Sequence, residues 1–257
     1  MAKNTTETPK GGAFQDLMNP LNRRNFLRYT GVGLATTAVI LTGCDDDDDS
    51  TVMNDDGTNT TTVNLGSGDI GVLNYAYALE QLEAAFYTAV VALPNFSTLF
   101  PSATERQVLT DIRNHEIAHR EFFKKAITAA AANQIIPALT PNLPASALAS
   151  RTSILATAKT FEDLGVAAYN GAGKLISSAG AAYLSIAGKI VSVEARHAAE
   201  IRDMIENGTF ASGPAGITAG NIVNANGLDV ALTPAQVLAA AQPFIKETIN
   251  GSNLPTQ

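Results

Sequence analysis

Two stretches of the chain carry the same acidic and histidine residues in the same order. Each has a lone glutamate followed by a Glu-x-x-His pair: Glu80 with Glu116 and His119, then Glu162 with Glu194 and His197. The lone glutamates and the pairs recur at nearly the same offset along the chain. A glutamate and a histidine three positions apart project from the same side of a helix. The pattern therefore predicts a duplicated helical hairpin whose two copies share one site.

The residues around the lone glutamates support the duplication. Glu, Leu, Ala and Tyr recur at identical spacing in the segments 80–87 and 162–169, which end in Tyr87 and Tyr169. Two such copies related by a pseudo-twofold axis would place one symmetric site between them.

Helical periodicity places the six residues on faces that should be buried. In the first helix, a stripe that advances by four and three consists of Leu73, Tyr77, Glu80, Ala84, Tyr87 and Val91. Glu162 and the two Glu-x-x-His pairs lie on similar stripes. Ionised carboxylates buried without partners cost several kcal/mol each. Two divalent cations would balance four carboxylates, and two neutral imidazoles would complete the ligand set.

Two other interpretations of these residues remain open. They could be ordinary surface or interhelical ion-pair residues. In addition, residues 115–119 spell His-Glu-x-x-His, the zinc protease helix in which His115 and His119 bind zinc and Glu116 is the general base. That interpretation leaves the repeat unexplained and finds only one other histidine in the chain. We therefore expect His115 on the outer flank of its helix.

Helix start and stop signals predict an all-α fold. The expected helices span residues 69–93, 102–132, 145–178, 181–207 and, near the C-terminus, 234–242. Gly171 and Gly173 could end the third helix early. Short links make each pair of long helices an antiparallel hairpin, and the proline-rich loop 133–144 can cross between the hairpins. The predicted fold is a ferritin-like arrangement, a four-helix bundle of two hairpins joined by a long crossover, with a short C-terminal helix.

The first 43 residues resemble a bacterial export signal. Residues 23–28 match the twin-arginine motif, and the apolar stretch that follows is too short to span a bilayer as a stable helix. Residues 41–44 resemble a lipobox, in which the signal peptidase cuts before a lipidated cysteine, here Cys44. A chance Arg-Arg pair before an apolar anchor is the alternative. The order of the three signals favours a lipoprotein of the cell envelope, on the periplasmic face of a membrane or at the outer-membrane surface.

The remaining segments flank the predicted bundle of residues 69–207. Residues 44–68 hold a run of five aspartates and then mainly Thr, Asn and Gly, a composition that predicts a disordered tether. Residues 208–257 form a C-terminal extension with the short helix.

Composition excludes several classes of function. Cys44 is the single cysteine, which excludes a disulfide framework, a Cys-rich zinc or iron–sulfur site and a rubredoxin-like module. Removing residues 1–43 leaves 12 of 17 basic and 22 of 24 acidic residues, a formal charge of −10. Nucleic acid is not an expected partner of such a chain.

The six residues resemble the di-iron carboxylate members of the ferritin-like superfamily. In those proteins, helices one and three each give a Glu, and helices two and four each give a Glu-x-x-His. Tyr87, seven positions after Glu80, also matches that group. The segment 82–87 and the C-terminal extension most resemble exported ferritin-like domain proteins of the desiccation-related type.

The resemblance implies a role for each residue. Glu116 and Glu194 would bridge two ions, Glu80 and Glu162 would be terminal ligands, and His119 and His197 would each hold one ion. Tyr87 and Tyr169 would act as hydrogen-bond donors or one-electron donors beside the ligands, although core packing explains a buried tyrosine equally well. Glu83 and Glu200 lie one turn from ligands and could add a carboxylate, but we expect them to be solvated or paired with bases.

Three functional hypotheses follow. The first is a redox enzyme in which two ions, iron or alternatively manganese, react with O2 or peroxide as a ferroxidase, peroxidase or catalase, with an external electron donor. The second is a lipid-anchored structural or binding bundle that acts in desiccation or envelope stress. The third is the zinc protease. The resemblance leaves room for a homodimer, whereas the membrane anchor on Cys44 argues against an iron-storage shell.

Overall fold

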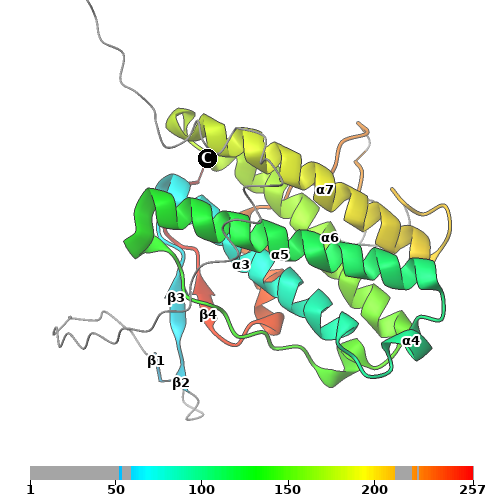
Figure 1. Cartoon of the computed structure of the whole chain (residues 1–257). Coiled ribbons are helices and arrows are strands. Elements are labelled where there is room, and N and C mark those ends of the chain that lie inside the picture. The colour runs from blue at the N-terminus through cyan, green and yellow to red at the C-terminus, as the bar shows by residue number, and fades with distance from the viewer. Residues whose placement is uncertain (1–51, 54–58, 212–221, 225, 257) are drawn as a thin grey trace, which may run out of the picture. The chain divides into compact units, whose positions relative to one another are not determined.

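The computed structural model describes residues 52–53, 59–211, 222–224 and 226–256 and is built around four long helices (Figure 1). These are α3 (Gly68–Val91), α5 (Ala103–Ala131), α6 (Arg151–Ala172) and α7 (Ala181–Ile205). The predicted all-α bundle is confirmed. The predicted signal peptide and Cys44 lie outside the described residues. Within these residues, no helix is both long enough and apolar enough to cross a membrane.

The connections follow the predicted topology. The short helix α4 (Phe96–Leu99) lies in the link from α3 to α5, and the short 3-10 helices η3 (Gly173–Leu175) and η4 (Ser178–Gly180) lie between α6 and α7. Each pair packs as a hairpin. The crossover from α5 to α6 runs through η1 (Ala132–Gln134) and η2 (Ala145–Leu148).

The helix ends follow capping chemistry, with one correction. The Ser102 hydroxyl accepts a hydrogen bond from the Glu105 amide at the start of α5, and Gly208 takes the left-handed conformation after α7 (φ 86°). The third long helix does not span 145–178. Its capping box is Ser150 with Ser153, because the preceding residues form a 3-10 turn after Pro144.

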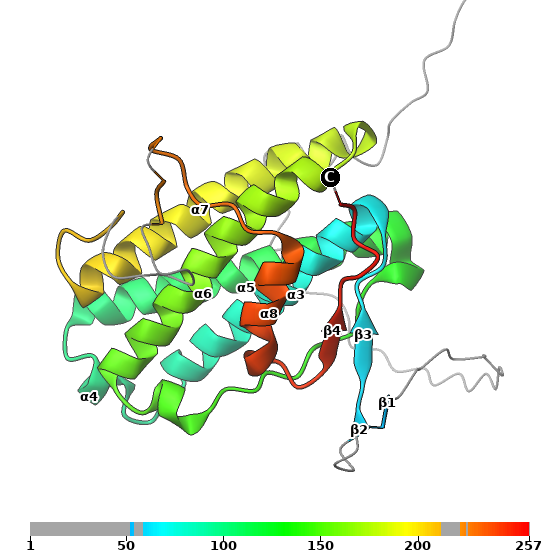
Figure 2. The same ribbon diagram turned by 180° about the vertical axis from the view of Figure 1, so that it is seen from behind.

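The C-terminal extension is part of the domain. Its strand β4 (Thr248–Asn250) pairs in parallel with β3 (Thr62–Asn64), and its helix α8 (Pro234–Ala241) packs on α6 (Figure 2). The expectation of a disordered tether up to residue 68 is therefore wrong for residues 62–67, where Val63 and Leu65 are buried. A second small pair joins β1 (Val52–Met53) to β2 (Asn59–Thr60).

The extension and the crossover enclose α3 on the side away from the other helices. The Asn74 side chain donates to the carbonyls of Leu65 and Gln134, and Gln81 accepts a hydrogen bond from the Leu139 amide. Consequently α3 is buried on nearly every side.

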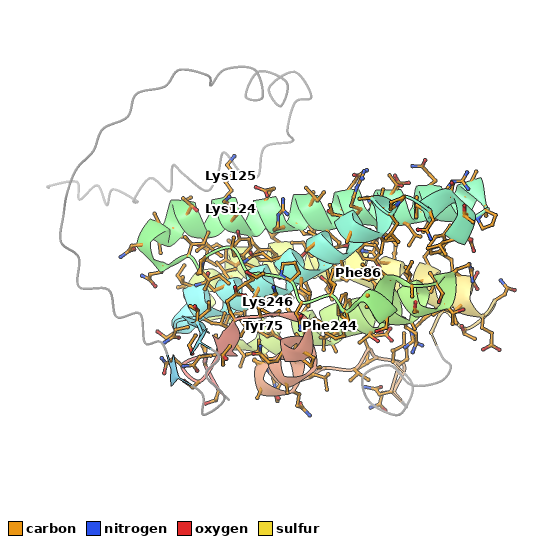
Figure 3. All side chains as sticks on the ribbon, turned by 90° about the horizontal axis from the view of Figure 1, so that it is seen from below. Tyr75, Phe86, Lys124, Lys125, Phe244 and Lys246 are labelled. Carbon is orange, nitrogen blue, oxygen red and sulfur yellow. The ribbon has the colours of Figure 1, made fainter. Side chains whose placement is uncertain are left out.

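Aromatic rings connect α3, α6 and the C-terminal extension. Phe161 of α6 makes edge contacts with Phe86 of α3 and with Phe244 of the extension, at centroid distances of 5.1 and 4.8 Å. Figure 3 shows Phe86 and Phe244 among the packed helices and the extension, whereas Lys124 and Lys125 project from the outer side of α5.

The close approach of the extension to α6 requires a glycine. A Cβ atom at Gly171 would lie 1.7 Å from the Leu232 carbonyl oxygen. We expect Gly171→Ala to destabilise the protein by about 1–3 kcal/mol, the usual cost of overpacking. Gly188→Ala in α7 is the matched control, since a Cβ there would meet nothing within 4 Å, and alanine favours helix. Urea denaturation checks both, and equal stability of the two variants would contradict the contact.

Candidate metal centre

The four long helices bring the six predicted residues together at the centre of the bundle. The contributions are Glu80 from α3, Glu116 and His119 from α5, Glu162 from α6, and Glu194 and His197 from α7. All four carboxylates are completely buried, His197 is buried, and the His119 side chain is 12% exposed. Such burial contradicts the interpretation as surface ion-pair residues.

The six residues form two overlapping groups, each compact enough to hold a metal ion. One comprises Glu80, Glu116, His119 and Glu194; the other comprises Glu116, Glu162, Glu194 and His197. In each group, the candidate ligand atoms lie within 4.8 Å of one another. Both groups share Glu116 and Glu194, the arrangement that bridging carboxylates require.

The distances around the two histidines repeat the same pattern. In the first group, His119 Nδ1 lies 2.8 Å from Glu194 Oε1, 3.4 Å from Glu80 Oε2 and 3.5 Å from Glu116 Oε2. In the second group, His197 Nδ1 lies 2.8 Å from Glu116 Oε1, 3.4 Å from Glu162 Oε2 and 3.6 Å from Glu194 Oε2. Each shared glutamate thus offers one oxygen to each group.

These ligand atoms have no other use within the described part of the chain. Both oxygens of Glu116 and of Glu194, Oε2 of Glu80 and of Glu162, and Nδ1 of both histidines are buried, and the polar atoms they approach belong to the cluster itself. Buried polar atoms are normally hydrogen-bonded, and buried charges are paired or bind metals. The donor set of carboxylate oxygens and imidazole nitrogens suits iron or manganese. The residues therefore fit a two-metal site, and their individual roles as ligands stay a prediction.

Two tyrosines fix the terminal glutamates. The Tyr87 hydroxyl on α3 donates to Glu162 Oε1 at 2.5 Å, and the Tyr169 hydroxyl on α6 donates to Glu80 Oε1. Each tyrosine thus holds the glutamate of the other hairpin, which leaves that glutamate's Oε2 turned to the shared site. These two reciprocal hydrogen bonds have the pseudo-twofold symmetry that the sequence repeat predicts. Second-sphere hydrogen bonds of this kind orient metal ligands.

The buried glutamates and histidines shift one another's pKa values. Burial raises the pKa of Glu116 to about 8 and that of Glu162 to about 7. Burial also acts to raise the pKa of Glu194, but its contacts with the two histidines outweigh this and lower it to about 2. Burial acts to lower the pKa of His119, but the surrounding carboxylates raise it to about 12, and they raise that of His197 as well. In the metal-free protein, the two protonated histidines therefore offset part of the negative charge of the carboxylates.

Glu83 differs from the expectation of a solvated or base-paired side chain. It is 4% exposed, and burial, followed by the charges of Glu194 and Glu116, raises its pKa well above the usual range. When Glu80 is aligned with Glu162, the counterpart of Glu83 in the second hairpin is Gly165. A Cβ atom at Gly165 would lie 3.0 Å from Glu83 Oε1, so the glycine leaves the space that Glu83 occupies. This pairing of a glutamate with a glycine in the repeat was the sequence signal that a further carboxyl group is buried beside the site. Glu200 is exposed, as expected.

His115 is exposed, as expected, but it also contacts the site. Its Nδ1 lies 2.8 Å from Nε2 of His197, and the two rings stack at a centroid distance of 5.1 Å. If Nδ1 of His197 held a metal, Nε2 would carry the hydrogen and would donate it to Nδ1 of His115. When the two Glu-x-x-His pairs are aligned, the counterpart of His115 is Val193. His115 belongs to neither metal-binding group of the described residues, which weakens the zinc protease hypothesis.

Metal binding should release protons. At pH 7 both histidines of the metal-free cluster are protonated because their pKa values are raised, and a metal must displace these protons to bind. Affinity should therefore rise with pH from 7 upward. Calorimetric titration with Mn²⁺ in two buffers of different ionisation enthalpy measures the protons released. An uptake of protons, or binding independent of pH, would contradict the protonated cluster.

Comparison with known proteins identifies the region that carries the site. A family model described as a ferritin-like domain matches residues 68–207, more than half of the chain. No curated protein matches the chain significantly.

Proposed function

Because the chain belongs to the ferritin-like domain family, we propose that it is an exported, lipid-anchored protein whose buried centre holds two divalent ions, iron or alternatively manganese. The convergence of buried carboxylate oxygens that, among the described residues, approach no polar group outside the cluster carries this proposal. A ferroxidase, or an activity that removes peroxide or O2, is the function that such a centre supports best. Two ferrous ions, if held by these residues, would supply two electrons for reduction of the oxidant, and a catalytic cycle would need an external electron donor.

The chain's own residues prepare the centre for this chemistry. Tyr87 and Tyr169 hold the terminal glutamates in place, and Glu116 and Glu194 span both positions. Glu83 holds a proton beside them, since its pKa is raised well above the usual range. Burial of the four carboxylates keeps bulk water from the centre. Reduction of O2 or peroxide consumes protons, so a buried protonated carboxyl group suits the reaction.

The N-terminal motifs support the proposed location in the cell envelope. Twin-arginine export carries folded proteins, which fits a centre loaded with metal in the cytoplasm. A lipid on Cys44 would tether each subunit to a membrane and hinder assembly of a closed storage shell. The family relationship and the envelope location are also compatible with a desiccation-related protein.

A structural bundle is the second candidate. It is favoured by the complete burial of all four carboxylates, which restricts access of large substrates to the centre. In that case, the metals would stabilise the bundle without turnover.

Metal analysis and iron oxidation separate these candidates. The Cys44→Ser protein, which cannot be lipidated, should bind close to two metals per chain. Aerobic titration with Fe(II) should then give the absorbance of a diferric centre. Glu194→Gln should lose most binding at both positions because it removes a shared ligand, and exposed Glu200→Gln is the matched control. Binding without iron oxidation would favour the structural bundle; a single zinc ion would contradict the two-metal site.

The export and anchor proposals have their own test. Replacement of Arg23 and Arg24 by lysine should keep the protein in the cytoplasm, because the export motif requires both arginines. Cys44→Ser should move the exported protein from the membrane to the soluble envelope fraction and abolish labelling with a radioactive fatty acid. Membrane association of Cys44→Ser at the level of the unchanged protein would contradict a lipid anchor.

A further inference from the structure

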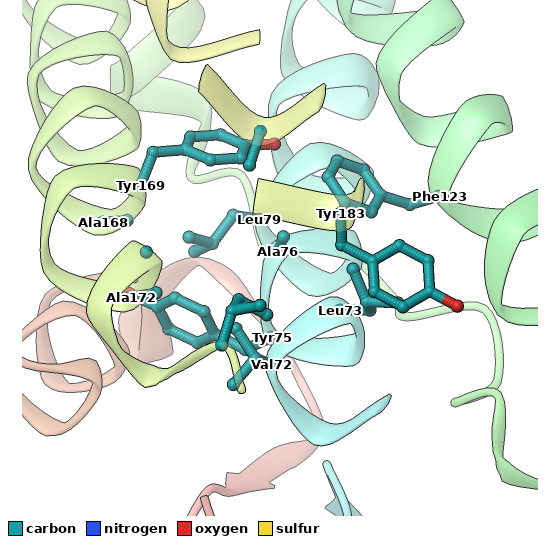
Figure 4. Close-up of a pocket in the computed structure, with 13 residues that line it drawn as sticks. Val72, Leu73, Tyr75, Ala76, Leu79, Phe123, Ala168, Tyr169, Ala172 and Tyr183 are labelled. Atoms are coloured by element: carbon teal, nitrogen blue, oxygen red, sulfur yellow. The ribbon is translucent and has the colours of Figure 1, made fainter. Parts of the chain in front are cut away.

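A small apolar pocket lies at one end of the bundle. It is lined by side chains of α3, α5, α6 and α7, among them Leu73, Ala76, Phe123, Ala172 and Tyr183, and its cavity volume is about 30 Å³ (Figure 4). The half-buried residues Ile176 and Tyr183 lie at its rim, so the pocket extends toward the surface.

The pocket adjoins the metal centre through Tyr169. The ring of Tyr169 lines the pocket, and its hydroxyl donates to Glu80. Figure 4 shows this ring across the pocket from Phe123. Ala76 lies one turn before Glu80 on α3, and Phe123 lies one turn after His119 on α5. The pocket is therefore next to the group that contains Glu80 and His119.

Three small residues that line the pocket have larger counterparts in the repeat. The alignment of Glu80 with Glu162 matches Ala168 and Ala172 to larger residues, and the alignment of the two Glu-x-x-His pairs does the same for Ala187. Their counterparts are Phe86, Val90 and Leu109, and all three are completely buried. Small residues thus open the space beside one metal position, and large residues fill it beside the other.

Size and polarity restrict what can occupy this pocket. An engineered apolar cavity of about 150 Å³ binds benzene; this pocket, at about 30 Å³, is far smaller and suits a molecule of only a few atoms. Hydrogen peroxide would bury two hydroxyl groups. The wall offers one buried hydroxyl without a partner among the described residues, that of Tyr75, because Tyr169 is bonded to Glu80. Burying polar groups without partners is costly.

We propose that this pocket binds dioxygen and delivers it past Tyr169 to the metal position of Glu80 and His119. The inference rests on the proposed function and selects O2 over peroxide as the oxidant. Dioxygen is small and apolar, so transfer from water into this pocket breaks no strong hydrogen bonds. The second metal position would receive dioxygen only through the first.

Xenon tests the pocket without any metal. The metal-free protein should bind xenon beside Leu73 and Leu79, detected by xenon-induced shifts of their methyl NMR signals, and the double variant Ala172→Val with Ala187→Leu should lose this binding. The double variant copies the residues of the other hairpin. Ala167→Val, which adds volume to a separate cavity lined by α6, α7 and the residues that follow α7, is the matched control and should keep xenon binding beside Leu73 and Leu79. If the double variant does not fold, Ala187→Leu at the half-buried position replaces it.

Iron oxidation tests the delivery of O2. The filled variant should raise the KM for O2 several-fold, leave kcat at saturating O2 unchanged and leave oxidation by added peroxide unchanged. Iron oxidation with an unchanged KM for O2, or xenon binding that survives the filling, would overturn the pocket's role alone. Xenon binding in a protein that oxidises no iron would overturn the proposed redox function, and with it the delivery of O2.

Discussion

The burial of four carboxylates at the centre of the bundle is the constraint on which the rest of the structure depends. Ionised groups removed from water cost several kcal/mol each unless charges of opposite sign offset them. Two tyrosine hydroxyls and two histidines satisfy part of this demand, and the remaining oxygens converge on two positions. Helices that are packed on several sides hold such groups at fixed distances. This explains why α3 is enclosed on both sides, by the other helices and by the crossover and the C-terminal extension.

The duplication supplies a symmetric set of ligands, and three departures from it make the two metal positions different. Glu83 faces Gly165, so a fifth carboxyl group enters from one hairpin only. His115 contacts His197, whereas its counterpart Val193 has no imidazole to offer. Ala172 leaves space where its counterpart Val90 fills it. Each departure lies beside the six residues of the candidate centre and none changes them, so the two positions have different environments while the set of candidate ligands stays symmetric.

The sequence predicted the bundle and its central residues because two signals agreed there. Helical periodicity placed the six residues on buried faces, and the repeat related them in pairs. The pairing of β3 with β4 could not be predicted in the same way, since such short strands from opposite ends of the domain show no periodicity. The burial of Glu83 was missed because it lies off the predicted core stripe, and the crossover and extension that cover α3 come from segments with weak signals. The contact of His115 with His197 depends on side-chain geometry between two helices.

The two candidate metal positions differ in the polarity of their surroundings. The position of Glu80 and His119 adjoins an apolar pocket through the ring of Tyr169. The position of Glu162 and His197 is linked to an imidazole, His115, that is exposed to solvent. An apolar molecule and a proton prefer opposite surroundings, and a single opening could not serve both well. The proposed reduction of O2 would need both, and the broken symmetry would supply one beside each candidate metal position, while both positions share Glu116 and Glu194.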